Sequence, residues 1–380
     1  MFGKRVTLFK LLGLEIRIDA SWLIIAVLIT WSLATGYFPM DYKDLPPATY
    51  WWMGASGALG LFASIIFHEL CHSIVARKFG IPMRGITLFI FGGVAEMDQE
   101  PPSPKSEFLI AIAGPISSGF LAFLFYRLHD FSGSLALSVP IQGVLHYLGW
   151  INAILAVFNL VPAFPLDGGR VLRSILWYMK NDLRWATRVA SSCGSGFGLI
   201  LIFLGIFTFL GGNIMGGLWW VLIGLFLRGA SQKSYEQLLI QRAFEGEPVS
   251  RFMKTDPLTV PRWLPLKEFV EEYIYKYHFK MFPVQEDGRL VGCVTTRNVK
   301  EVPQDEWERR TVGEIARDCT RENSISPDAD ALAALSVMSK GGYSRLIVVK
   351  NGQLVGVISM KDLLNFLALK LDLEDQDDQH

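Results

Sequence analysis

His68, Glu69 and His72 form an HExxH motif inside the apolar segment FASIIFHELCHSIVA. If this segment is helical, residues four apart lie on one face, so both imidazoles can reach the same metal ion. Glu69 projects near that face and can take a proton from a water molecule at the ion. Two nitrogen ligands, one carboxylate and an open position for water suit zinc. The motif therefore indicates a site for one catalytic zinc ion per chain.

The surroundings of the motif make this interpretation more specific. By composition alone, HExxH arises by chance in roughly one chain in a hundred of this length. Ionisable side chains in a membrane span carry a penalty of several kcal/mol unless they face protein, water or a metal. A polar contact between helices is the alternative interpretation.

Asp167 is the candidate third ligand, in the segment FNLVPAFPLDGGR. Two prolines there break the preceding helix, and the two glycines after Asp167 allow a tight turn that can orient its carboxylate. A helix cap or surface turn is the alternative, because Asp-Gly is a common turn pair. Asn159, in the same segment, can either donate a hydrogen bond to the oxyanion formed on attack or bond to a neighbouring helix.

Composition divides the chain into two parts. Of the 380 residues, 51% are hydrophobic and 19% are charged. Long apolar blocks fill residues 16–230, whereas residues 231–380 have the composition of a soluble domain. The length also favours two units. The formal net charge is zero, so nothing argues for a nucleic-acid partner.

The first part predicts six membrane spans, since a bilayer core needs about 20 apolar residues per helix. The stretches are 18–38, 50–79, 106–127, 143–162, 187–210 and 214–230. Lys and Arg gather before the first span, after the second, between the fourth and fifth and after the sixth. This pattern predicts a multi-pass protein of the cell membrane, surrounded by lipid, with both termini in the cytoplasm. Residues 81–104 do not fit a span and read as a strand or hairpin that packs on protein beside the second span.

The second part contains an internal repeat. Residues 282–299 align with residues 346–363, which places Gly288 on Gly352 and Gly292 on Gly356. Each copy reads as a helix, two strands around a turn, and a helix. A duplicated unit of this size usually pairs with itself to bury one shared core.

The motifs HELCH, GGVAEM, AGPISS and NLVPAFPLDGGR, taken in this order, resemble the site-2 protease family. Within it, the chain is similar to six-span members with a C-terminal pair of CBS domains. The resemblance implies a polytopic α-helical membrane domain of six transmembrane helices with a membrane-associated strand or hairpin, followed by an α+β tandem CBS pair. The implied layout is a protease domain (1–230), a linker (231–248), CBS repeats (249–303 and 312–368) and an acidic tail (369–380).

The resemblance also implies the chemistry of an intramembrane zinc metalloprotease. His68, His72 and Asp167 would bind zinc, Glu69 would act as general base, and Asn159 would assist near the scissile carbonyl. The substrates would be transmembrane segments of other proteins, which must unwind locally before attack. The strand-prone segment 86–91 can clamp the unwound chain by strand addition, with Thr87 and Phe89 as candidate contacts.

The tail carries a second candidate site. Ser359 and Asp362 complete, with Gly356, the pattern of adenosine-binding CBS repeats, whereas the first repeat has Thr295 but Asn298 in the acidic place. The resemblance implies regulation by an adenine nucleotide, ATP or AMP. A purely structural module that forms a homodimer through the CBS pair is the alternative.

Two other functions are compatible with parts of the sequence. A CBS-regulated membrane transporter or channel would use the intramembrane His, Glu and Asp as an ion path, although ion paths do not require HExxH followed by LDG. An inactive relative would bind membrane segments without cleaving them, and the intact Glu69 argues against it.

Overall fold

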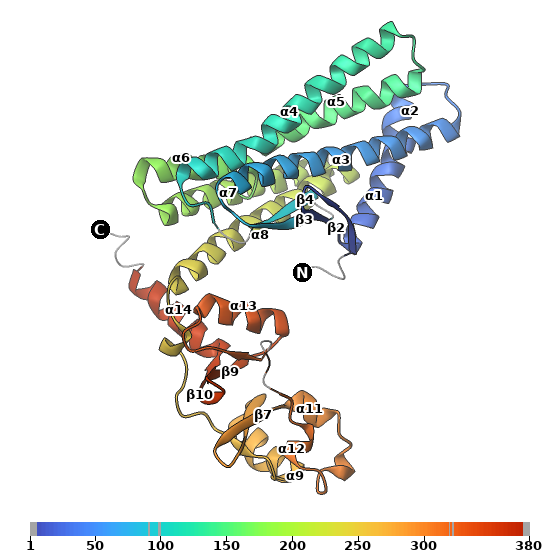
Figure 1. Cartoon of the computed structure of the whole chain (residues 1–380). Coiled ribbons are helices and arrows are strands. Elements are labelled where there is room, and N and C mark those ends of the chain that lie inside the picture. Colours follow the sequence, from blue (N-terminus) through green and yellow to red (C-terminus); the bar gives the residue numbers. More distant parts are fainter. Residues whose placement is uncertain (1–5, 90–91, 98–99, 319, 321–322, 375–380) are drawn as a thin grey trace. The chain divides into compact units, whose positions relative to one another are not determined.

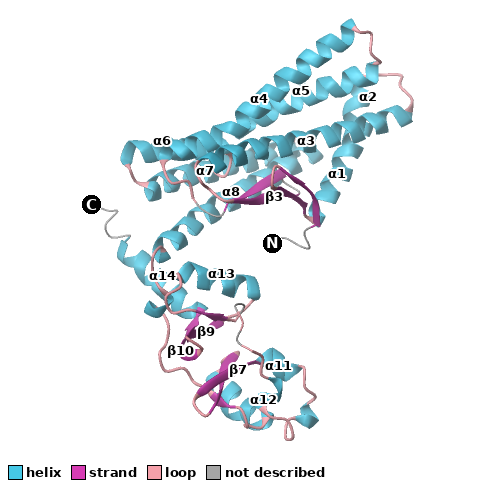
Figure 2. Cartoon of the chain, in the orientation of Figure 1, coloured by secondary structure: helices cyan, strands magenta, loops and turns pink. Residues whose placement is uncertain are grey.

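The computed structural model describes the whole chain except residues 1–5, 90–91, 98–99, 319, 321–322 and 375–380. The chain forms two compact units, Met1–Glu236 and Gln237–His380. Their boundary lies inside a long helix, α8 (Ile214–Phe244), so residues 231–244 of the predicted linker are helical. Figure 1 follows the chain from end to end, and Figure 2 distinguishes helices from strands.

Long helices build most of the first unit (Figure 1), and several of them are apolar. Among the described residues, five helical stretches are long and apolar enough to cross a bilayer. They are Ala20–Asp41 (α1, Ala20–Ser32, continued by the π-helix η1, Leu33–Tyr37, and α2, Phe38–Asp41), α3 (Pro47–Lys78), α4 (Pro104–Ser134), α5 (Val139–Asn159) and α7 (Leu183–Leu210). Each overlaps one of the first five predicted spans. The short helix α6 (Asp167–Lys180) lies between α5 and α7 in the chain.

The sixth predicted span, residues 214–230, forms the first part of α8. This part packs on α7 through glycines of both helices. A Cβ added at Gly205 would lie 2.8 Å from the Gly217 carbonyl oxygen, and one at Gly224 would lie 2.5 Å from the Gly198 carbonyl oxygen. Close packing of small residues is a common means of helix association in lipid. The packing agrees with a sixth span, and the number six stays a prediction.

A four-stranded sheet packs on α3. Its strands, in spatial order, are β1 (Val6–Leu11), β2 (Leu14–Ile18), β3 (Met83–Phe89) and β4 (Gly92–Met97). Leu14 and Ile16 of β2 and Ile86 of β3 bury their side chains together with Leu70 of α3. The prediction of a hairpin that packs on protein beside the second span is therefore confirmed for the described residues.

The prediction that Thr87 clamps a substrate by strand addition is wrong, whereas the one for Phe89 stays a prediction. Both residues belong to β3, which pairs in parallel with β2 and antiparallel with β4. Thr87 pairs with Arg17 of β2 and with Val94 of β4, so it has no free edge to offer, and it is only 2% exposed. The pairing with β2 ends at Leu88, one residue before Phe89. The open edge on this side of the sheet belongs to β4.

The second unit contains two similar three-stranded sheets. The first has the order β5 (Val260–Pro261), β6 (Met281–Glu286) and β7 (Arg289–Thr295), and the second has the order β10 (Gln353–Ser359), β9 (Arg345–Lys350) and β8 (Ser324–Ile325). The helices are η2 (Val249–Arg251), α9 (Leu266–Glu268), η3 (Phe269–Ile274), α10 (Tyr275–Tyr277), α11 (Thr296–Lys300), η4 (Gln304–Glu306), α12 (Val312–Ile315), α13 (Ala331–Gly341) and α14 (Met360–Glu374). Because α14 continues to Glu374, residues 369–374 of the predicted acidic tail are helical.

The hairpin turns confirm the repeat alignment. Gly288 and Gly352 have φ angles of 76° and 78°, and the residues before them, Asp287 and Asn351, have φ angles of 50° and 53°. Two consecutive residues with positive φ are typical of the tight turns that match the twist of paired strands, which explains the Asp-Gly and Asn-Gly sequences.

Candidate functional site

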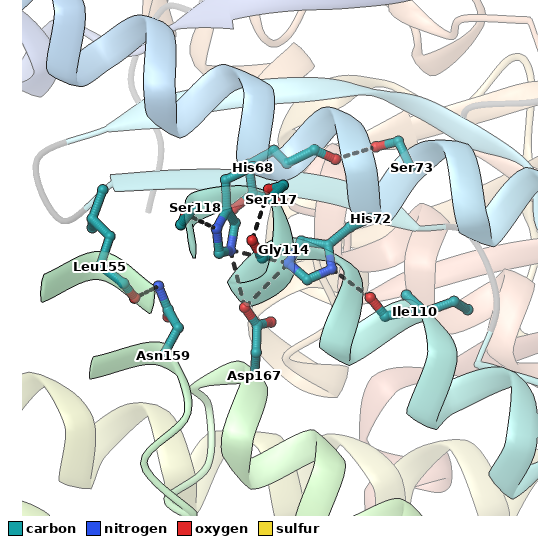
Figure 3. A network of polar contacts seen from close by, with 11 residues as sticks. His68, His72, Ser73, Ile110, Gly114, Ser117, Ser118, Leu155, Asn159 and Asp167 are labelled. Atoms are coloured by element: carbon teal, nitrogen blue, oxygen red, sulfur yellow. Dashed lines mark hydrogen bonds and ion pairs between the residues drawn. The ribbon is translucent and has the colours of Figure 1, made fainter. Parts of the chain in front are cut away.

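Three ligand atoms from α3 and α6 converge in the first unit (Figure 3). The Oδ2 atom of Asp167 lies 3.0 Å from Nε2 of His68 and 3.1 Å from Nε2 of His72, and the two Nε2 atoms are 3.1 Å apart. In a tetrahedral zinc site with bonds of about 2.0–2.1 Å, neighbouring ligand atoms are about 3.3 Å apart. The observed spacing therefore fits a zinc ion.

Both imidazoles are oriented by α4. The Nδ1 atom of His72 donates to the Ile110 carbonyl oxygen over 2.6 Å. A carbonyl can only accept, so the ring proton is on Nδ1 and the lone pair of Nε2 is left to bind a metal. The Nδ1 atom of His68 lies 2.9 Å from Oγ of Ser118, which can accept in the same way.

The backbone of α4 also lines the space between the ligands. A Cβ added at Gly114 would lie 2.2 Å from Nε2 of His72 and 2.4 Å from Nε2 of His68. Any side chain there would fill the position that an ion needs. The absence of a side chain at Gly114 thus supports the fit of the three ligands to a metal.

The chain before Asp167 is held by close backbone contacts. A Cβ at Gly168 would lie 2.3 Å from the Leu160 carbonyl oxygen, so only glycine allows residues 160–166 to fold back over α6. Ser231 of α8 donates to the Phe164 carbonyl oxygen. Asp167 is the first residue of α6 and is 9% exposed, and the helix has no side-chain N-cap bond. A capping or surface-turn role for Asp167 is therefore wrong.

Glu69 and Asn159 lie near the three ligands. Glu69 contacts β4, because a Cβ at Gly93 would lie 2.9 Å from its Cγ atom. Asn159 is the last residue of α5, and its Nδ2 atom donates to the Leu155 carbonyl oxygen over 3.0 Å. Figure 3 shows Asn159 on the same side of the histidines as Asp167.

The two histidines lie near the basic end of the long helix α3. His72 precedes Lys78, at the basic end of α3, by six residues, which is about 9 Å along a helix. The 32 residues of α3 extend for about 48 Å, longer than a hydrocarbon core of about 30 Å. If Arg77 and Lys78 lie at the bilayer surface, the three ligands lie within the bilayer.

Comparison with known proteins identifies the chain. A family model of peptidase family M50 matches residues 56–137 and 129–204, and a CBS domain model matches residues 249–305 and 312–369. The chain is 33% identical over 364 residues to Rip3 of Mycobacterium tuberculosis, a protein named as a zinc metalloprotease, and the match covers 95% of this chain and 92% of Rip3. The chain belongs to peptidase family M50. It is a zinc metalloprotease of the site-2 protease type, in a membrane protein that carries two CBS domains.

A second zinc metalloprotease and a solved site-2 protease structure also match the chain. The protein sll0528 of Synechocystis, also named as a zinc metalloprotease, is 32% identical over 361 residues, which cover 94% of either chain. The solved structure of the site-2 protease from Methanocaldococcus jannaschii is 31% identical, with a TM-score of 0.43, and covers 60% of this chain and 94% of that one. Membership of family M50 excludes the transporter or channel interpretation.

A cavity of about 250 Å³ lies between the two CBS repeats. It is lined by Ser359 and Asp362 of the second repeat, and Ser359 donates to the Asp362 carboxylate. Lys254 and Arg345 also line it, and the Arg345 guanidinium carbon lies 3.5 Å from the centre of the Phe279 ring. Partial burial lowers the pKa of Arg345, against the opposing effect of the Asp362 charge, but a guanidinium remains protonated at neutral pH.

Thr295 does not line this cavity. Its hydroxyl accepts from the Asn298 backbone N–H and donates to the Asn298 side chain, which caps α11. Ser359 and Asp362 make the same pair of contacts at the start of α14. The two repeats therefore share a capping arrangement and differ in the charge of one residue.

Sequence reasoning missed four groups at the metal centre: Gly93, the Ile110 carbonyl, Gly114 and Ser118. The motifs GGVAEM and AGPISS contain three of them. These motifs supported the resemblance, but their spacing says nothing of what they touch. A glycine inside an apolar helix is the one signal that pointed to a close approach.

Proposed function

We propose that this family M50 member hydrolyses peptide bonds within or next to transmembrane segments of other membrane proteins. The observation that carries the proposal is the convergence of His68, His72 and Asp167, whose ligand atoms all lie within 4.8 Å of one another. They belong to a bundle whose helices are long and apolar enough to cross a bilayer. A peptide bond that reaches them belongs to a chain that shares the membrane.

Each residue has one role in the proposed reaction. Zinc held by His68, His72 and Asp167 supplies Lewis-acid chemistry, which activates water at neutral pH and polarises the scissile carbonyl. Glu69 takes the proton from the attacking water and passes it to the leaving nitrogen. Asn159 turns its Nδ2 from Leu155 to the carbonyl oxygen, where negative charge develops.

Purified protein tests these roles. We expect about one zinc ion per chain in the wild type and in Glu69→Gln, and little zinc in His68→Ala. Co-expressed single-span membrane proteins should be cut by the wild type only. Cleavage by Glu69→Gln, or full zinc in His68→Ala, would contradict the proposal.

We infer that the unwound substrate lies along β4. This strand is at one end of the sheet, and it approaches Glu69 so closely at Gly93 that no side chain fits between them. A strand edge pairs readily with an extended chain. The chain added to β4 would therefore lie next to the general base.

Cysteine cross-linking tests the β4 edge. In a Glu69→Gln background, cysteine at Val94 or Ala95 should form a disulfide with a cysteine beside the scissile bond of the substrate. Cysteine at Thr87 is the matched control, because Thr87 is buried on the adjacent strand. Equal cross-linking at Thr87, or none at either β4 position, would remove β4 from the substrate path.

We also propose that the cavity between the CBS repeats binds an adenine nucleotide and that binding alters cleavage. The Asp362 carboxylate suits ribose hydroxyls, and the cations of Lys254 and Arg345 suit phosphate oxygens. Titration calorimetry with ATP and AMP should give saturable binding, and a cleavage assay with each nucleotide would give the sign of the effect. Absence of binding by both nucleotides would leave the CBS pair with a structural role.

The proposed location is the cell membrane, with both termini in the cytoplasm. Lys and Arg gather on one side of the predicted spans, and the loops on the other side are poor in them, as the positive-inside tendency predicts. An impermeant thiol reagent should label cysteine placed at Asp44 or Asp130 in intact cells, but not cysteine placed at Lys180. The opposite labelling would reverse the orientation.

A further inference from the structure

A buried ion pair joins α6 to α4 close to the metal centre. Nε of Arg173 donates to Oε1 of Glu107 over 2.6 Å, and its Nη2 donates to Oε2 of Glu100 over 3.0 Å. Arg173 is 4% exposed, and Glu107 is fully buried. The Arg173 guanidinium also lies 5.2 Å from the ring centre of Phe164, in the loop before Asp167.

Stability alone is a poor reason for this pair. Removing two charges from water is costly, and buried pairs are often replaced by apolar residues of similar volume without loss of stability. The planar Arg173 guanidinium, by contrast, donates to the Glu107 and Glu100 carboxylates through N–H groups held at fixed angles, which fixes its distance and direction relative to α4 and the segment before it. The pair therefore fits a geometric role.

The two partners belong to the two helices that shape the site. Arg173 follows Asp167 by six residues on α6. Glu107 precedes Ile110 and Gly114 by about one and two turns of α4, so the three lie on one face. The Ile110 carbonyl orients His72, and Gly114 lines the space for the ion. A bond between Arg173 and Glu107 thus relates the carboxylate ligand to the groups that hold the histidines.

Zinc coordination is sensitive to such a relation. A rotation of α6 by about 20° would move an atom about 5 Å from the helix axis by roughly 1.7 Å. Ligand distances in zinc sites vary by only about 0.2 Å. Without a directional contact between α6 and α4, apolar packing would have to hold this rotation by itself.

We propose that Arg173 and Glu107 are positioning residues that set the rotation of α6 on α4 at which Asp167 meets His68 and His72. The inference rests on the proposed function, since it assumes that Asp167 holds zinc. On this inference, the ion pair contributes to the geometry of the metal site and not to the stability of the helix bundle.

The double variant Arg173→Met, Glu107→Leu tests the proposal, because it removes both charges and keeps apolar volume. In detergent, we expect its melting temperature to equal or exceed that of the wild type. We expect its zinc affinity, measured by competition with a chelator, to fall by about tenfold to hundredfold. The visible spectrum of the Co²⁺-loaded protein should shift as the ligand geometry changes. Arg127→Gln, Asp130→Asn removes an exposed pair from α4 and should change neither affinity nor spectrum.

Wild-type zinc affinity and an unshifted Co²⁺ spectrum in the double variant would overturn the proposal. Arg173→Lys is the second variant, because it keeps the charge and loses the planar set of N–H donors, and an intermediate affinity is expected. If both variants fail to fold, the pair is structural and the proposal is also overturned. Asp167→Ala separates the two levels of inference. Full zinc affinity in that variant would refute the proposed ligand set itself. If Asp167→Ala loses zinc affinity and the double variant keeps the wild-type affinity, only the positioning role is refuted.

Discussion

The metal centre and the cavity between the CBS repeats meet opposite demands. At the metal centre, the three candidate ligand residues are at most 9% exposed, and a backbone atom of α4 lines the space between them. The cavity of about 250 Å³ is lined by charged side chains from both repeats among apolar ones, and the Lys254 side chain is 75% exposed. A site for an ion requires that no side chain fill the space between its ligands. A site for a larger ligand is defined by the charges that it presents, so we expect it to tolerate changes in side-chain size.

The largest expected effect is at Gly114. In Gly114→Ala, the new Cβ would lie within 2.4 Å of both Nε2 atoms, so zinc affinity should fall by more than about a hundredfold. Metal analysis of the purified variant measures this loss. Gly119→Ala is the matched control, because a Cβ five residues further along α4 meets open space. Equal zinc content in the two variants would show that the metal centre does not depend on the missing side chain at Gly114.

The next effect is at Gly93, where the new side chain would meet the general base and leave the ligands untouched. In Gly93→Val, displacement of Glu69 should lower kcat by about a hundredfold, while zinc content stays near that of the wild type. Cleavage and metal content measured on the same preparation distinguish this from a loss of the ion. Unchanged cleavage would show that Glu69 does not depend on β4.

A smaller effect is expected at Ser118. In Ser118→Ala, His68 loses the partner of its Nδ1 atom, and zinc affinity should fall by about tenfold. Ser117→Ala is the control, because the Ser117 hydroxyl donates to the Gly114 carbonyl oxygen within its own helix. Chelator competition that ranks the two variants equally would count against orientation by Ser118.

The smallest expected effect is at Asp362, in the cavity between the CBS repeats. Asp362→Ala should weaken adenine-nucleotide binding by about tenfold, through loss of a charged hydrogen-bond acceptor. Asn298→Ala should leave binding within about twofold of the wild type. Both residues belong to equivalent capping pairs, so both variants lose the same local contact. A difference in nucleotide affinity between them would therefore report on contact with the nucleotide. Similar loss of binding in both variants would place the nucleotide elsewhere.

Local spacing predicted the parts of the site that lie within one helix or one repeat. His68, Glu69 and His72 share a helix, so their common face follows from helical geometry. The repeat alignment predicted the turns at Gly288 and Gly352 because each copy serves as a check on the other. Asp167 was a candidate by residue type, but only the fold brought it to the histidines.

Contacts between segments that are far apart in the sequence could not be predicted from it. Thr87 lost its proposed role because residues 15–18, near the N-terminus, pair with residues 85–88 and occupy the edge of β3. No strand was predicted there, since this stretch was interpreted as the basic segment that leads into the first span. Ser118 and the Ile110 carbonyl were missed for a similar reason, because their importance lies in which ring nitrogen they face.

The missing side chain at Gly114 has a consequence for reading related genomes. A homologue can keep both histidines, the glutamate and the aspartate and still be unable to load a cofactor, if alanine or serine stands at this one place. Surveys that score only the acidic and histidine signatures would count such a chain as competent. A requirement for glycine at this position would separate homologues that can bind the metal from those that cannot, before any of them is purified.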